Sequence, residues 1–169
     1  VNRVSEHYAL SGKDTWQTPQ SIISRIEKHV NIDLDPCAGA DTYIGDENIR
    51  LEDGRDGLKE DWYGTVFVNP PFSYKKKWCE KIKQELDNTQ RIFLITPDST
   101  DVVSWWHGYI AEHAEYVWFS ESRVKYIDPD TGEEAGSPTF GTALSMYGDI
   151  PEGLLYDFDN EGWVVESIF

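Results

Sequence analysis

The chain has 169 residues, enough for one domain with its own core and too few for two ordinary domains. Its 31 acidic residues outnumber 15 basic ones, giving a net charge of −16. Seven Trp, nine Tyr and seven Phe exclude a disordered acidic tail. No apolar run approaches the roughly 20 residues of a membrane span and no signal peptide is visible, so we expect a cytoplasmic protein.

Helices and strands are predicted to alternate along the chain. Residues 1–14 are polar and are expected to be flexible. The first helix is predicted from Pro19 to Val30, with Thr18 as its cap and isoleucines along one face. Residues 65–68 form an unbroken apolar run, as expected of a strand buried on both faces. The other elements predicted are a strand at 31–35, loops over 38–63, helices at 73–86 and 101–113, and strands at 91–96, 116–119, 123–127, 140–147 and 163–169.

This alternation predicts an α/β fold with a mostly parallel central sheet, in a single domain over residues 1–169. Ligands of such sheets bind beyond the carboxyl ends of the strands. Three predicted strand ends carry a polar residue followed by proline: Asp35-Pro36, Asn69-Pro70 and Thr96-Pro97. We therefore expect the functional site where these three ends meet.

The tetrapeptide Asn69, Pro70, Pro71 and Phe72 suits chemistry on an amino group. The prolines have a fixed φ, so the carbonyl of Pro70 is held stiffly, and the Asn69 side chain supplies a second acceptor. Two fixed acceptors can bind both hydrogens of an aromatic amine and direct its lone pair toward a methyl donor. The Phe72 ring offers a surface on which a base that has left the duplex can stack.

At this point the sequence resembles the small phage-encoded DNA N6-adenine methyltransferases of the Dam type, over residues 14–147. The resemblance implies a class I methyltransferase fold, S-adenosylmethionine as cofactor and DNA as partner. It also implies that Asp35 binds the methionine amino group and that Asp56, or else Glu52 or Asp53, binds the adenosine. The cofactor residues expected from the matching blocks are Trp16, Thr18, Pro19, Asp35, Pro36, Cys37, Ala38, Asp56, Gly57 and Leu58.

DNA contacts are expected in two regions. Five lysines follow the tetrapeptide directly, and this clustering in an acidic chain favours a face that contacts phosphates. Arg123 and Lys125 resemble a further family block, and Phe140 is expected to shape the wall of the base pocket. The DNA-binding residues predicted are Lys75, Lys76, Lys77, Arg123, Lys125 and Phe140. No metal is expected, because His107 and His113 share no helix face well.

Other functions remain open from the residues alone. The tetrapeptide also suits N4 of cytosine, an RNA base or a glutamine side chain. Pro36-Cys37 is a Pro-Cys dipeptide of the kind that C5-cytosine methylation needs, but it lies where the cofactor is expected. The acidity favours adaptation to high salt, in a halophilic host or its virus. A non-enzymatic acidic decoy that binds basic proteins is the alternative from another class.

Overall fold

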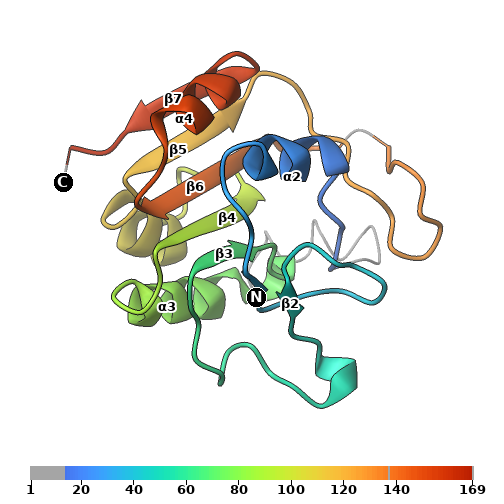
Figure 1. The fold of residues 1–169 in the computed structure, drawn as a ribbon. Coiled ribbons are helices and arrows are strands. Elements are labelled where there is room, and N and C mark those ends of the chain that lie inside the picture. The colour runs from blue at the N-terminus through green and yellow to red at the C-terminus, as the bar shows by residue number, and fades with distance from the viewer. Residues whose placement is uncertain (1–13, 137, 169) are drawn as a thin grey trace.

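The computed structural model describes residues 14–136 and 138–168. These residues form a seven-stranded sheet with helices packed against it (Figure 1). Its strands lie in the order β2-β1-β3-β4-β6-β5-β7. Strands β1 to β4 pair in parallel, and β5 runs the same way because it is antiparallel to β6, which is antiparallel to β4. The predicted mostly parallel α/β sheet is therefore confirmed. The strands are β1 Leu34–Asp35, β2 Glu47–Asn48, β3 Thr65–Val68, β4 Arg91–Pro97, β5 Tyr116–Ser120, β6 Thr142–Gly148 and β7 Gly162–Glu166.

Helices cover the sheet on both faces. α2 (Gln20–Glu27) and α4 (Glu152–Asp159) lie together on one face, and α3 (Lys75–Glu85) packs with the π-helix η3 (Val103–Ala111) on the other (Figure 1). Two short 3₁₀ turns, η1 (Leu51–Asp53) and η2 (Phe72–Tyr74), lie in the loops.

Strand β3 shows how the sequence divides the core into two halves. Phe67 points into the core beneath α2 and α4, whereas Val66 and Val68 point into the core beneath α3 and η3. All four residues of the strand are buried, as predicted from the apolar run. The strand ends where Pro70 and Pro71 begin, which places the tetrapeptide at the carboxyl edge of the sheet.

The structure also corrects several predicted elements. The strand expected at 123–127 is absent from the sheet, and only Ile127 makes isolated bridges, to Gln17 and Glu134. The reason is that β5 already pairs on both sides, with β6 and β7. The helix α4 was not predicted, although Pro151 precedes it and Leu154 and Phe158 form its buried face. The helix expected at 101–113 is a π-helix over a shorter range.

Within the described ranges, no helix is both long enough and apolar enough to cross a bilayer.

Candidate active site

The Asn69 side chain is tied to the N-terminal segment. Its Nδ2 donates hydrogen bonds to the backbone carbonyl of Trp16 at 2.6 Å and to the Thr18 hydroxyl at 3.0 Å. A carbonyl can only accept, so the amide nitrogen must face Trp16 and the amide oxygen Oδ1 must point the other way. Two blocks that are distant in sequence therefore meet, and the acceptor atom of Asn69 has a fixed direction.

Asp14 holds the end of the same tetrapeptide. The Phe72 N–H donates to the Asp14 carbonyl at 3.0 Å, and the Ser73 N–H donates to the Asp14 carboxylate at 2.8 Å. The expectation that residues 1–14 are flexible is therefore wrong for Asp14, whereas residues 1–13 lie outside the described residues. No sequence motif indicates Asp14 as a site residue. Its position two residues before Trp16, in an expected cofactor block, is the one feature of the sequence that could have suggested it.

The Phe72 ring is covered rather than open. It is 4% exposed and meets two other rings edge to face, Phe140 with centroids 5.4 Å apart and Tyr126 with centroids 6.5 Å apart. The Tyr126 hydroxyl is hydrogen bonded to the Thr142 hydroxyl at 3.1 Å, which fixes that ring. Phe140 and Tyr126 thus both lie against the tetrapeptide, and the role of Phe140 in a base pocket stays a prediction.

Asp35 ends strand β1 beside the tetrapeptide. Its side chain is buried, and this burial raises its pKa to about 7 against the opposing effects of the Cys37 N–H, which donates to Oδ1 at 3.1 Å, and of Arg50. The Cys37 thiol donates to the Asn69 carbonyl at 3.2 Å. Burial and the nearby Asp35 charge hold the pKa of Cys37 well above its usual range, so this thiol is a poor nucleophile and does not suit C5-cytosine chemistry.

The block at Asp56 packs directly on the Asp35 loop. A Cβ on Gly57 would lie 1.9 Å from the carbonyl oxygen of Pro36, so only glycine fits there. The Gly57 carbonyl accepts a hydrogen bond from Trp62 Nε1 at 2.8 Å. The Asp56 carboxylate accepts from the Leu58 N–H at 3.1 Å, and its side chain is 28% exposed. Two expected cofactor loops are thereby brought together.

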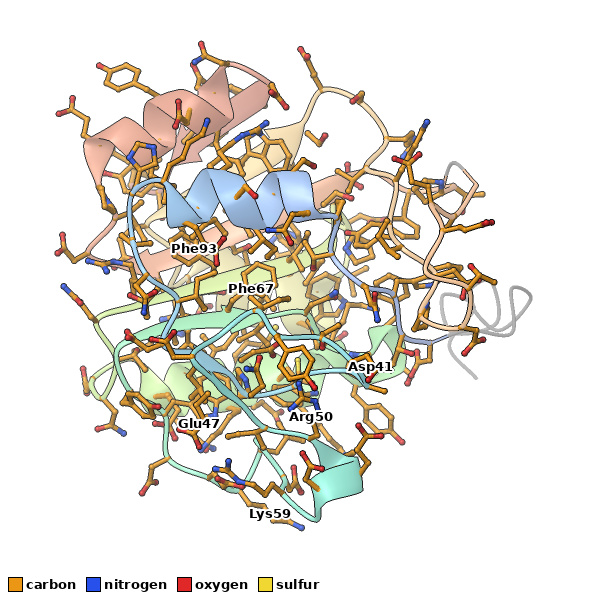
Figure 2. All side chains as sticks on the ribbon, turned by 45° about the vertical axis from the view of Figure 1, so that its right-hand side comes forward. Asp41, Glu47, Arg50, Lys59, Phe67 and Phe93 are labelled. Carbon is orange, nitrogen blue, oxygen red and sulfur yellow. The ribbon has the colours of Figure 1, made fainter. Side chains whose placement is uncertain are left out.

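Arg50 organises the loop between β1 and β2, and the sequence did not indicate it. Its Nε donates to the Gly39 carbonyl at 3.1 Å, and its guanidinium also binds the Thr42 carbonyl (Figure 2). The guanidinium carbon lies 4.7 Å from the centroid of the Tyr43 ring, and Tyr43 is itself exposed. The charge of Arg50 also partly opposes the rise in the pKa of Asp35 that burial causes.

The lysines after the tetrapeptide do not form one charged face. Lys75 is buried and Lys81 is buried in an ion pair with Glu85, so the expected phosphate contact at Lys75 is wrong: its charge does not reach the surface. Lys76 lies 3.9 Å from Glu80, and Lys77 lies over the Tyr74 ring. These two side chains are exposed, and their contact with DNA stays a prediction.

The second region predicted to contact DNA, around Arg123 and Lys125, lies on the surface of the protein. Arg123 and Lys125 are both exposed, and Lys125 pairs with Glu134 at 3.5 Å.

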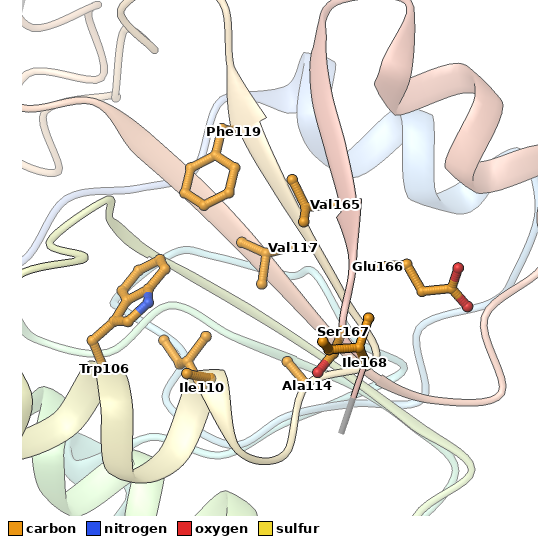
Figure 3. A pocket seen from close by; sticks show the side chains of 10 residues that line it. Trp106, Ile110, Ala114, Val117, Phe119, Val165, Glu166, Ser167 and Ile168 are labelled. Atoms are coloured by element: carbon orange, nitrogen blue, oxygen red, sulfur yellow. The ribbon is translucent and has the colours of Figure 1, made fainter.

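A cavity of about 260 Å³ lies elsewhere, between η3 and strands β5 and β7 (Figure 3). Trp106 and Ile110 line it from η3, and Phe119 and Val165 line it from the strands. None of the predicted site residues borders it. Across the described residues, no cluster of three or more His, Cys, Asp or Glu side chains is placed to bind a metal ion.

The sheet order and the helices on both of its faces define a mostly parallel α/β domain. The family model described as DNA N-6-adenine-methyltransferase (Dam) matches residues 6–149, and the chain belongs to this family. The resemblance predicted from the sequence, and with it the enzyme class of an adenine-specific DNA methyltransferase, is confirmed.

Two phage proteins are similar to the chain. The DNA N-6-adenine-methyltransferase of Haemophilus phage HP1 is 31% identical over 129 residues, covering 73% of this chain and 72% of the phage protein. The protein of the same description from Escherichia phage T1 is 21% identical over 159 residues, covering 83% of this chain and 65% of the phage protein. A solved structure of a proposed RNA methyltransferase from Pyrococcus horikoshii is 11% identical with a TM-score of 0.49, covering 82% of this chain and 88% of that one.

Proposed function

We propose that the chain transfers the methyl group of S-adenosylmethionine to the N6 amino group of adenine in DNA, at Asn69-Pro70-Pro71-Phe72. The observation that carries this proposal is the hydrogen bond from Asn69 Nδ2 to the Trp16 carbonyl, which fixes Asn69 Oδ1 as an oriented acceptor. Amino methylation needs such acceptors, because the lone pair of an aromatic amine is delocalised into its ring.

Two acceptors act on the amino group. Asn69 Oδ1 and the Pro70 carbonyl oxygen each accept one N–H of the adenine amine, and this favours a pyramidal nitrogen whose lone pair is directed out of the ring plane. The gain lies in positioning and in electrostatic stabilisation of developing positive charge on nitrogen. No covalent enzyme intermediate is needed, in keeping with a Cys37 thiol whose pKa is held well above its usual range.

The residues at the strand ends suit the proposed cofactor. Asp35 is a buried carboxyl that a cationic amino group can ionise. The half-buried Asp56 carboxylate, whose Oδ2 lies 3.1 Å from Lys59 Nζ, is proposed to bind hydroxyl groups of the cofactor. The two loops are locked together by the contact between Gly57 and Pro36. When bound, S-adenosylmethionine supplies an electrophilic methyl group on a sulfonium. The residues proposed to line its site are Trp16, Thr18, Pro19, Asp35, Pro36, Cys37, Ala38, Asp56, Gly57 and Leu58.

The covered Phe72 ring supports a base that enters by displacement. The target adenine must leave the duplex, because its amino group is paired there. Phe140 is only partly buried and lies on an irregular segment, whereas Tyr126 is buried and hydrogen bonded to Thr142. We therefore assign Phe140 as the ring that the base displaces from Phe72.

The acidic surface of the chain bears on how it binds DNA and at what salt concentration it works. The exposed cations proposed to contact phosphates are Lys76, Lys77, Arg123 and Lys125, few for a protein with a net charge of −16. Such a surface fits a protein that works at high salt, where base stacking and base hydrogen bonds provide most of the affinity. The phage origin of its relatives supports a viral source. Greater stability and activity in dilute buffer than in molar KCl would contradict this adaptation.

The activity is tested by incubating DNA with isotopically labelled S-adenosylmethionine, digesting it and identifying the labelled nucleoside by mass. We expect N6-methyladenine. Label in N4-methylcytosine, or label transferred to RNA or to a protein glutamine when these are offered in place of DNA, would change the proposed substrate and leave the amino-methyl chemistry in place. A chain that binds no cofactor and transfers no label would instead support the acidic decoy.

A further inference from the structure

A lysine is buried behind the proposed catalytic loop. Lys75, the first residue of α3, is only 6% exposed. Its ammonium group donates a hydrogen bond to the Phe72 carbonyl and lies 5.5 Å from the centroids of both the Phe72 and the Trp105 rings. Burying an ammonium opposes folding unless polar groups or aromatic faces compensate for the lost water, and here a carbonyl and two rings do so.

Asp14 binds the backbone of the same loop, at Phe72 and Ser73. The Phe72 N–H donates to the Asp14 carbonyl at 3.0 Å, so both backbone polar groups of Phe72 are bound, the N–H by Asp14 and the carbonyl by Lys75. The Asp14 carboxylate also accepts from the Ser73 N–H at 2.8 Å. The end of the loop that carries Asn69 is therefore fixed between Asp14 and Lys75.

We infer that Lys75 is a positioning residue for methyl transfer, whose ammonium holds the Phe72 carbonyl and ring and so keeps the acceptors of Asn69 and Pro70 in place. This inference rests on the proposed function. It gives Lys75 a role distinct from the phosphate contact that the sequence suggested. Small displacements of reacting groups lower the rate strongly, so loss of this hold should act on kcat more than on binding.

The charge of Lys75 makes the role visible in a pH profile. Burial lowers the pKa of Lys75 to about 8, while Asp14 from the N-terminal segment and Cys79 on its own helix act in the opposite direction. The pKa of Cys79 is itself raised to about 12 by burial, so this thiol stays neutral in the same range. Above a pH of about 8 the attraction of Lys75 to the two rings and to Asp14 is lost. The kcat should then fall along an alkaline limb.

The test compares Lys75→Met and Lys75→Arg with wild type, and uses Lys28→Met, at an exposed lysine in the turn after α2, as the control. We expect Lys75→Met to lower kcat about tenfold or more with cofactor affinity within about twofold, to remove the alkaline limb, and to be partly rescued by Lys75→Arg. A Met variant with wild-type kcat, or one that keeps the alkaline limb, overturns the inference.

Hydrogen exchange of the wild-type amides of Phe72 and Ser73 gives a readout that needs neither a variant nor catalysis. Their protection should fall as pH rises through the pKa of Lys75, after correction for the intrinsic exchange rate, while the protection of Phe93 in β4 stays constant. Unchanged protection at Phe72 and Ser73 counts against the inference. If no methylated nucleoside forms at all, the proposed function fails, whereas the exchange result still decides whether Lys75 holds the loop.

Discussion

Asn69 and Trp16 lie 53 residues apart in sequence, yet the Asn69 amide nitrogen donates to the Trp16 backbone carbonyl across 2.6 Å. This bond settles the orientation of a side chain whose two ends are otherwise alike in shape. It also joins an expected cofactor block to an expected catalytic block. The direction of the amide oxygen, on which the proposed amino methylation depends, is therefore set by the segment that precedes α2.

Gly57→Ala should disrupt the packing between the two proposed cofactor loops, the loop at Asp35-Pro36 and the loop at Asp56-Gly57. The added Cβ would lie 1.9 Å from the Pro36 carbonyl oxygen, so one loop has to move. We expect a loss of about 2–3 kcal/mol of stability, as for other overpacked sites, and weaker cofactor binding. Thermal unfolding and calorimetric titration measure the two effects. Gly136→Ala is the matched control, because no atom lies within 4 Å of its Cβ position; equal behaviour of the two variants would show that the loops are not locked at Gly57.

Cofactor affinity should depend on pH through Asp35. Its pKa is raised from 3.8 to about 7 in the free protein, so its contribution to stability is fully present below 3.8 and is lost as pH rises through about 7. A bound cationic amino group favours the ionised form. Affinity should therefore weaken as pH falls below about 7, by up to about tenfold per pH unit.

Calorimetric titration of the cofactor across this pH range, in buffers of different ionisation enthalpy, measures both the affinity and the protons released. Asp35→Asn should bind weakly and without this pH dependence. An affinity for the wild type that is constant between about pH 6 and about pH 8 would exclude the proposed role.

The two rings of the base pocket should differ in their effect on catalysis. Phe72→Ala removes the proposed stacking partner and should lower kcat/KM about tenfold to a hundredfold, because stacking contributes about 1–3 kcal/mol per base. Phe140→Ala removes only the ring that is displaced, so kcat/KM should stay within about threefold of wild type. Steady-state kinetics on one duplex compares them. Equal losses would mean that Phe140 stays in place and binds the base itself.

The strands could be predicted where apolar residues run without interruption. Residues 65–68 were placed correctly because a strand covered by helices on both faces needs no polar side. The pairing partner of each strand is harder to predict from sequence, because pairing depends on contacts between segments that are distant in the chain. The segment 123–127 has strand-like residues, but the neighbouring strand β5 is already paired on both sides, with β6 and β7. The short apolar face of α4 is interrupted by acidic residues, so the sequence does not predict this helix.

Within the site, the sequence identified residue types but not their surroundings. The sequence predicts a surface charge at Lys75, since lysines are rarely buried. Its burial depends on Trp105 and Phe72, which the fold brings together from different elements. The anchoring by Asp14 and by Arg50 was invisible for the same reason: each binds backbone carbonyls or amides, which leave no mark in a sequence.

The most direct measurement is the amount of N6-methyladenine formed by Asn69→Ala beside wild type, with S-adenosylmethionine affinity measured on the same samples. Asn88→Ala, at an exposed asparagine in the turn after α3, is the control. We predict that Asn69→Ala loses at least about a hundredfold in kcat, as expected when an oriented acceptor is removed, while its cofactor affinity stays within a few-fold of wild type. Wild-type amounts of N6-methyladenine from Asn69→Ala would contradict the assignment of the tetrapeptide as the catalytic loop.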